Sequence, residues 1–187
     1  MVQRKMPQWF IQITAYADRL IQDLDTIDRP EETKIAQRNW IGRSAGAEID
    51  FVAHHHDATT TITVFTTRPD TLYGVTAVVL APENTLIDSL LDSAHREELD
   101  KYRQQTFAKT PVQRQQELKE KSGVFSGVYA KHPLTGKDIP IRFADYVLAD
   151  YGSGAVMMVP AHDERDFEFA KKFGIEIVPV IEGEVLE

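Results

Sequence analysis

Apolar residues recur with a helical period near the N-terminus, and this predicts a helical arm ahead of a β-rich domain. Residues 9–24 place one apolar stripe on a helix, which Asp28-Arg29-Pro30 interrupts. A shorter helix is expected over Glu31–Asn39. The pattern therefore predicts an arm over residues 1–43 and a second domain over residues 44–187.

The hydrophobic period changes to two at Ala47, which predicts paired strands. The stretches "AEIDFVA" (47–53) and "TTTITVFTT" (59–67) alternate, and residues 54–58 would form the loop between them. The stretch "GVTAVVLAPE" (74–83) is apolar almost throughout, so we expect a strand that is buried on both faces.

The second half of the chain mixes both periods. The elements that we expect there are a helix at 85–106, a polar helix at 112–121, a hairpin turned at 132–138, a strand at 155–159 and a helix at 164–173. Gly174 should end the last helix, because glycine readily takes the left-handed conformation at that position. The predicted fold class is therefore mixed α/β, a β-rich domain with helices laid on it.

The composition excludes several classes of function but adds little about the fold. The chain has 187 residues, a net charge of −8, a pI near 5.3 and no cysteine. An acidic surface argues against a module that binds duplex nucleic acid by itself, but not against a site that admits only the end of a strand. The missing cysteines exclude disulfides and thiolate chemistry, and no stretch is long and apolar enough to predict a membrane span.

Two groups of side chains are candidates for chemistry on residue type alone, and each has a structural explanation. Asp163 is well placed to cap the last helix, and Asp166 follows in the first turn, so this pair by itself favours a capping role. The run His54-His55-His56 suggests a metal site, but adjacent residues on a strand face opposite sides and cannot easily converge on one ion. We therefore expect no metal.

The threonines divide into two sets. Those within 59–63 suit a strand because they are β-branched. Thr66, Thr67 and Thr71 instead straddle a Pro-Asp turn where the chain leaves the sheet. On physical grounds, a structural turn and a binding site explain these hydroxyls about equally well.

Five segments, taken together, resemble the editing domain of leucyl-tRNA synthetase. "FTTRPDTLYGVTAVVLAPE" (65–83) and "YGSGAVMMVPAHDERDFEFAKKFG" (151–174) resemble its threonine-rich and GTG/HDxRD segments. The flanking segments that also resemble it are "QWFIQITAYADRLIQDLD" (8–25), "QRNWIGRSAGAEIDF" (37–51) and "GVFSGVYAKHPLTGKDIPIRFADYVL" (123–148). The resemblance implies a β-barrel-like core with surrounding helices, as in the valine, isoleucine and leucine enzymes.

Details of these segments indicate which group of editing domains the chain resembles. The related isoleucine and valine enzymes typically continue the threonine turn with Thr-Pro-Trp, whereas this chain continues with Arg68-Pro69-Asp70, as in bacterial or organellar leucine enzymes. Ser153 stands where threonine is usual, Tyr73 where phenylalanine is common and Asn84 where histidine often occurs. No HIGH or KMSKS sequence is present, so the chain looks like the excised editing insertion with a piece of flanking helix and should not aminoacylate.

The resemblance also implies a role for each site residue. Asp166 would anchor the substrate's α-ammonium, Thr66, Thr67 and Arg68 would line the water and carbonyl side, and Thr71 would exclude the leucyl group. The residues that would bind the rest of the substrate are Met157, Val159, His162 and Asp163 in the amino-acid pocket, and Leu148 and Tyr151 near the terminal adenosine.

The implied reaction is hydrolysis of the aminoacyl ester of mischarged tRNA(Leu). The partners would be the 3′ CCA end of that tRNA and the remainder of the synthetase. No cofactor is expected in this fragment, since ATP serves the missing synthetic domain, and a monomer in the cytoplasm or an organelle is expected. A non-catalytic module that docks the tRNA 3′ end and a free-standing trans-editing hydrolase remain alternatives.

Overall fold

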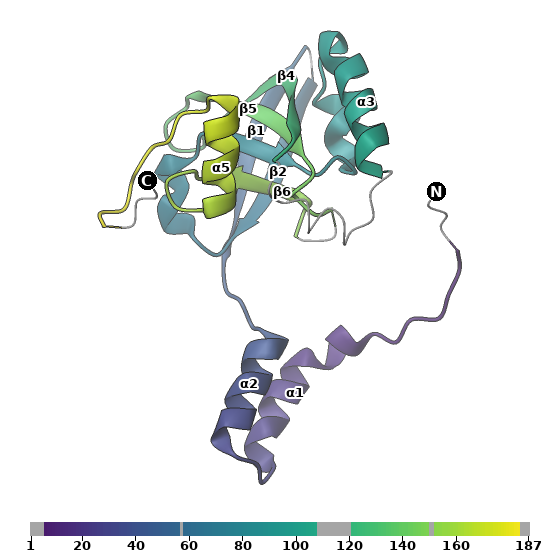
Figure 1. The fold of residues 1–187 in the computed structure, drawn as a ribbon, viewed down its shortest axis with the longest axis vertical. Helices are drawn as coiled ribbons and strands as arrows, with labels where there is room; N and C mark the ends of the chain where they lie inside the picture. Colours follow the sequence, from purple (N-terminus) through teal and green to yellow (C-terminus); the bar gives the residue numbers. More distant parts are fainter. Residues whose placement is uncertain (1–5, 57, 108–120, 150–151, 184–187) are drawn as a thin grey trace. The chain divides into compact units, whose positions relative to one another are not determined.

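The computed structural model describes residues 6–56, 58–107, 121–149 and 152–183 (Figure 1). Contacts between residues divide the chain into two compact units, one within residues 2–45 and one within residues 46–187. None of the helices in these described stretches is long and apolar enough to cross a bilayer.

The N-terminal unit is a helical pair. Its elements are the 3-10 helix η1 (Ile13–Tyr16), α1 (Ala17–Asp23), the 3-10 helix η2 (Leu24–Thr26) and α2 (Glu31–Ile41). The first helix begins later than the pattern predicts, and no side chain caps its start at Gln12 or Tyr16. Trp9 and Phe10, the first members of the predicted stripe, are exposed.

The larger unit is built on one six-stranded sheet in the order β2-β1-β4-β5-β3-β6. Its strands are β1 (Ala47–His55), β2 (Ala58–Thr66), β3 (Ala77–Leu80), β4 (Gly123–Lys131), β5 (Asp138–Ala144) and β6 (Ala155–Met158). Only the β3–β5 pairing is parallel. The predicted β1–β2 hairpin is confirmed, but β1 runs on through His54 and His55, and the chain turns at His56, where φ is 52°.

The helices confirm part of the predicted pattern. The last helix, α5 (Glu164–Phe173), has the expected bounds and ends at a left-handed Gly174. The predicted helix at 85–106 is instead three pieces: η4 (Thr85–Ser89), η5 (Ser93–His95) and α3 (Arg96–Phe107). Asn84 caps the first of these pieces, and the break comes at Asp92, whose side chain accepts a hydrogen bond from the Ala94 backbone N–H and starts a new turn. Most of the predicted helix at 112–121 lies outside the described residues.

Two apolar clusters pack on opposite faces of the sheet, and β3 contributes to both. Val78 and Leu80 pack in a cluster that includes Leu99 and Tyr102 of α3, whereas Ala77 and Val79 pack in one that includes Phe169 of α5. All four residues of β3 are buried, as its unbroken apolar run predicts. The two helices therefore cover the two faces of the sheet (Figure 1).

The sheet curls, but its hydrogen-bonded ladder is not closed in the described part of the chain. Strands β2 and β6 form its two edges, and they approach each other in space. The mixed α/β class is confirmed, and "barrel-like" describes the curl rather than a closed barrel. The 3-10 helix η3 (Pro69–Gly74) follows the end of β2, beside the place where the two edge strands approach each other without a hydrogen-bonded ladder.

Candidate active site

A pocket of about 460 Å³ lies where the end of β2, strand β6 and the start of α5 meet. Every predicted site residue that the structure describes lines it: Thr66, Thr67, Arg68, Thr71, Leu148, Met157, Val159, His162, Asp163 and Asp166. Tyr151 lies outside the described residues. A second pocket of similar size, about 440 Å³, is lined by Tyr129, Arg142 and Phe173 among others, and by none of the predicted residues.

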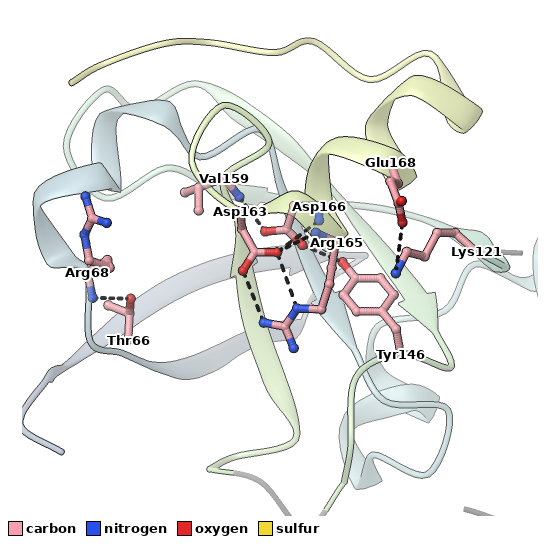
Figure 2. Close-up of polar contacts among 9 residues, drawn as sticks. All are labelled: Thr66, Arg68, Lys121, Tyr146, Val159, Asp163, Arg165, Asp166 and Glu168. Atoms are coloured by element: carbon pink, nitrogen blue, oxygen red, sulfur yellow. Dashed lines mark hydrogen bonds and ion pairs between the residues drawn. The ribbon is translucent and has the colours of Figure 1, made fainter. Parts of the chain in front are cut away.

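Asp166 is the buried carboxylate of this pocket. Only 5% of the residue is exposed. Its Oδ1 accepts a hydrogen bond from the Tyr146 hydroxyl at 2.9 Å, and its Oδ2 accepts one from the Val159 backbone N–H at 2.9 Å (Figure 2). Burial and the nearby Asp163 charge raise the pKa of Asp166 to about 7, although the two hydrogen bonds oppose the rise. Asp166 is therefore a carboxyl group poised to ionise when a cation approaches.

The helix cap belongs to Asp163 and not to Asp166. The Asp163 side chain accepts hydrogen bonds from the backbone N–H groups of Arg165 at 2.9 Å and Asp166 at 3.2 Å. Its other oxygen lies 3.2 Å from Arg165 Nη2. Burial opposes ionisation of Asp163, but Arg165 and the two N–H groups outweigh it and lower its pKa. The capping explanation therefore accounts for Asp163 and leaves the Asp166 side chain directed at the pocket.

The threonines at the end of β2 shape the turn that forms the opposite wall. The Thr66 hydroxyl accepts a hydrogen bond from the Arg68 backbone N–H at 3.0 Å, and the Thr71 hydroxyl donates one to the Arg68 carbonyl at 2.8 Å. The Arg68 guanidinium in turn pairs with Asp70, with Nη2 and Oδ2 2.9 Å apart. These hydroxyls thus have a structural role, and the same bonds fix where the wall lies (Figure 2 shows Thr66 and Arg68).

Thr71 contributes to the wall from a fully buried position. Its exposed fraction is 0%, whereas those of Met157 and Val159 are 6% and 8%. Because its hydroxyl is bonded to Arg68, its methyl group is held in a fixed direction. Thr71 nevertheless belongs to the residues that line the pocket.

His162 and Leu148 complete the predicted wall. His162 is half-buried, and its Nε2 accepts a hydrogen bond from the Val180 backbone N–H at 3.1 Å. Leu148 is 42% exposed at the rim. Sequence reasoning missed five lining residues: Phe65, Tyr146, Val147, Val156 and Arg165. Phe65, Val147 and Val156 neighbour predicted residues, but nothing local to Tyr146 distinguishes it.

The described residues contain no group of three histidine, aspartate or glutamate side chains placed to hold a metal ion. His54 lies with its Nδ1 3.1 Å from the Thr59 hydroxyl across the β1–β2 hairpin. The pocket offers two carboxylates, several hydroxyls, two arginines and an apolar wall. Such a set can hold a cationic group against Asp166 while positioning water near Thr66 and Thr67.

Comparisons with known proteins match both the family and the fold. Residues 38–186 match the family model described as "Leucyl-tRNA synthetase, editing domain". Among solved structures, the chain is similar to the agnB2 LeuRS of Agrobacterium radiobacter K84, crystallised in a ternary complex with tRNA and LeuAMS. The two share 38% sequence identity with a TM-score of 0.77, and the match covers 100% of this chain but only 22% of the other.

Proposed function

Because the chain belongs to the leucyl-tRNA synthetase editing-domain family, we propose that it performs post-transfer editing. The reaction is hydrolysis of the ester that joins a noncognate amino acid to the 3′ adenosine of tRNA(Leu). The observation that carries the proposal is that the predicted anchor, Asp166, shares one pocket with the threonine turn and the apolar wall. The partners would be the charged CCA end and the remainder of a synthetase.

The chemistry asked of this pocket is modest. An aminoacyl ester is already a reactive acyl group, so hydrolysis needs a positioned water and charge stabilisation more than a strong nucleophile. A second site is needed because a synthetic site that selects leucine gains only about 1–3 kcal/mol from one methyl group. An editing site then removes the near-isosteres that the first site accepts.

Asp166 would anchor every substrate and discriminate among none. All aminoacyl esters carry an α-ammonium group, and an ionised carboxylate can pair with it. The Asp166 oxygens each accept one protein hydrogen bond, and a carboxylate offers about four lone-pair sites, so acceptor capacity remains for a cation. A bound ammonium would also lower the raised pKa of Asp166, so anchor and substrate would stabilise each other's charge.

Discrimination would come from the apolar wall and the threonine turn. The methyl group of Thr71 would exclude the branched leucyl side chain, with Met157, Val159 and His162 bounding the same space. Thr66, Thr67 and Arg68 would lie on the side of the water and the ester carbonyl. Leu148 at the rim would meet the terminal adenosine, where we also place Tyr151.

The test is deacylation of mischarged tRNA(Leu) by the Asp166→Asn variant. Asparagine keeps the shape of the side chain: its oxygen can accept from the Val159 N–H, and its amide NH2 can donate to the Tyr146 hydroxyl. It cannot carry the charge that pairs with an ammonium. We expect deacylation to fall at least a hundredfold while the fold persists. The matched control is Asp50→Asn on β1, whose partner is Thr63 rather than the pocket. Retained activity in Asp166→Asn would contradict the proposal.

The same assay separates the alternatives. A non-catalytic module that docks the tRNA end would bind but not hydrolyse, both alone and within the parent synthetase. A free-standing trans-editing hydrolase would be fully active alone, whereas a fragment of a larger enzyme should gain activity when the rest of the synthetase holds the tRNA.

A further inference from the structure

We propose that Tyr146 is a positioning residue that orients the Asp166 carboxyl group and favours its charged form. The Tyr146 hydroxyl donates a hydrogen bond to Asp166 Oδ1 at 2.9 Å, and the ring lines the same pocket. Figure 2 shows the hydroxyl pointing at the carboxylate from the segment that follows β5. This inference rests on the proposed editing function, and it adds a residue that carries no charge and that no sequence pattern indicated.

The tyrosine ring is held on two sides, so the direction of its hydroxyl is fixed. On one side lies Phe169 of α5, with ring centroids 5.5 Å apart. On another lies the ammonium group of Lys121, 5.6 Å from the ring centroid. Lys121 is itself only 5% exposed and lies 3.4 Å from Glu168 Oε2 (Figure 2). A ring held in this way presents its donor without a large loss of side-chain entropy.

The hydroxyl acts on Asp166 as a donor at any ordinary pH. Burial and the adjacent Asp166 carboxylate raise the pKa of Tyr146 well above its usual value, so the phenol stays protonated. A donor to a carboxylate favours its charged form, and this bond lowers the pKa of Asp166 against the effect of burial. The charges of Asp163 and Arg165, at the start of its helix, also act on Asp166. The other titratable or charged side chains nearby are Lys121 and Glu168 behind Tyr146, and Arg68 and His162, which line the same pocket.

The experiment is the pH profile of kcat/KM for deacylation by Tyr146→Phe in the 187-residue chain. Without this charge-assisted donor, the midpoint of the pH profile should rise by about one pH unit. The value of kcat/KM at pH 7 should then fall about fivefold. The deficit should shrink toward pH 8.5, because Asp166 then ionises without help. A merely structural role predicts instead a loss that is the same at every pH, and that result would overturn the proposal.

The control is Tyr102→Phe. The Tyr102 hydroxyl donates to the Ser122 carbonyl at 3.0 Å and accepts from the Asp145 backbone N–H at 2.8 Å, so it supports the residue next to Tyr146. It does not line the pocket. This variant loosens the same segment but leaves the Asp166 bond in place, and its midpoint should not move.

A measurement that needs no activity separates this inference from the proposed function. The carbon-13 carboxyl signal of Asp166, assigned by its absence in Asp166→Asn, should titrate at higher pH in Tyr146→Phe than in the unaltered chain. A fluorinated tyrosine at position 146, which is a stronger donor, should move the midpoint down. An unchanged midpoint in both would refute the role of Tyr146, whereas an inactive chain with the expected shifts would refute only the editing activity.

Discussion

At the scale of single residues, the proposed selectivity depends most directly on the buried Thr71. Thr71→Ala should let the site hydrolyse correctly charged Leu-tRNA(Leu), because removing the methyl group and the hydroxyl opens space behind the wall. We expect at least a tenfold increase in deacylation of Leu-tRNA(Leu), measured with the domain placed in a complete leucyl-tRNA synthetase. A bulky residue at position 71 should close the site to all substrates.

Thr66→Ala, at a residue proposed to lie on the water side of the same pocket, is an informative comparison for that substitution. It also removes a threonine hydroxyl that bonds to the Arg68 main chain, but from a half-buried position at the end of β2. If Thr71→Ala still spares Leu-tRNA(Leu), the selective contact lies elsewhere in the wall. If both variants hydrolyse it equally, the turn as a whole rather than the Thr71 methyl group sets selectivity.

Asp166 should also make folding stability depend on pH. Its pKa rises from 3.8 to about 7 on folding, so between these values the folded chain binds more protons than the unfolded chain. Stability from this group is therefore greatest below about pH 4 and is lost as the pH rises toward 7. The free energy of unfolding of the unaltered chain, relative to that of Asp166→Asn, should fall on the order of 2 kcal/mol between pH 5 and pH 8. Urea titrations at the two pH values measure it, and a constant difference would show that the pKa is not raised.

The candidate site residues could be predicted from the sequence only because whole segments resemble a known family. Asp163 and Asp166 look alike locally, and only the structure shows that one caps the helix while the other faces the pocket. Tyr146 could not be predicted, because its partner Asp166 lies 20 residues away and is brought close only by the packing of α5 on the sheet. The complete burial of Thr71 likewise depends on packing that no local pattern encodes.

At the scale of elements, the start of α5 couples helix stability to the chemistry of the site. Asp163→Ala removes the cap and should destabilise the domain by about 1 kcal/mol. Asp163→Asn keeps a good cap but removes a charge that raises the pKa of Asp166. We expect this variant to retain stability while its deacylation midpoint moves to lower pH, as thermal melts and a pH–rate profile would show. A midpoint that stays constant in Asp163→Asn would mean that the Asp163 charge does not reach Asp166.

Helices and strands were predicted with correct bounds where the capping residues and the hydrophobic period indicated the same segment. Helix α5 has an aspartate cap, an amphipathic interior and a terminal glycine, and its predicted bounds match the structure. The single helix predicted over 85–106 was wrong because Asp92 caps a new turn inside that range, although the apolar spacing continues across it. The order of strands in the sheet, including the parallel β3–β5 pair, depends on contacts far apart in sequence and was not predicted.

At the scale of the whole molecule, the sheet domain should fold without the helical arm. Both apolar clusters of the sheet are drawn from residues 49–177, and Leu24 is the only buried apolar residue among the described residues of the arm. A chain of residues 46–187 should therefore melt cooperatively, within about 2 °C of the full chain, since changes remote from a core cost little. Circular dichroism would measure this. Phe51→Ala in the core should by contrast cost about 3–5 kcal/mol, and non-cooperative melting of the shortened chain would show that the arm is required.

The edge strands β2 and β6 approach each other without a hydrogen-bonded ladder, and this affects how the pocket between them can change over evolution. The pocket lies between two edge strands that share no hydrogen-bonded ladder, so its side chains can change without breaking backbone hydrogen bonds between strands. Side chains such as Met157 and Val159 can then be exchanged for larger or smaller ones with the architecture left standing. Under the proposed editing function, a few substitutions among these lining residues would therefore adapt the pocket to a different noncognate amino acid, with the strand pairing unchanged.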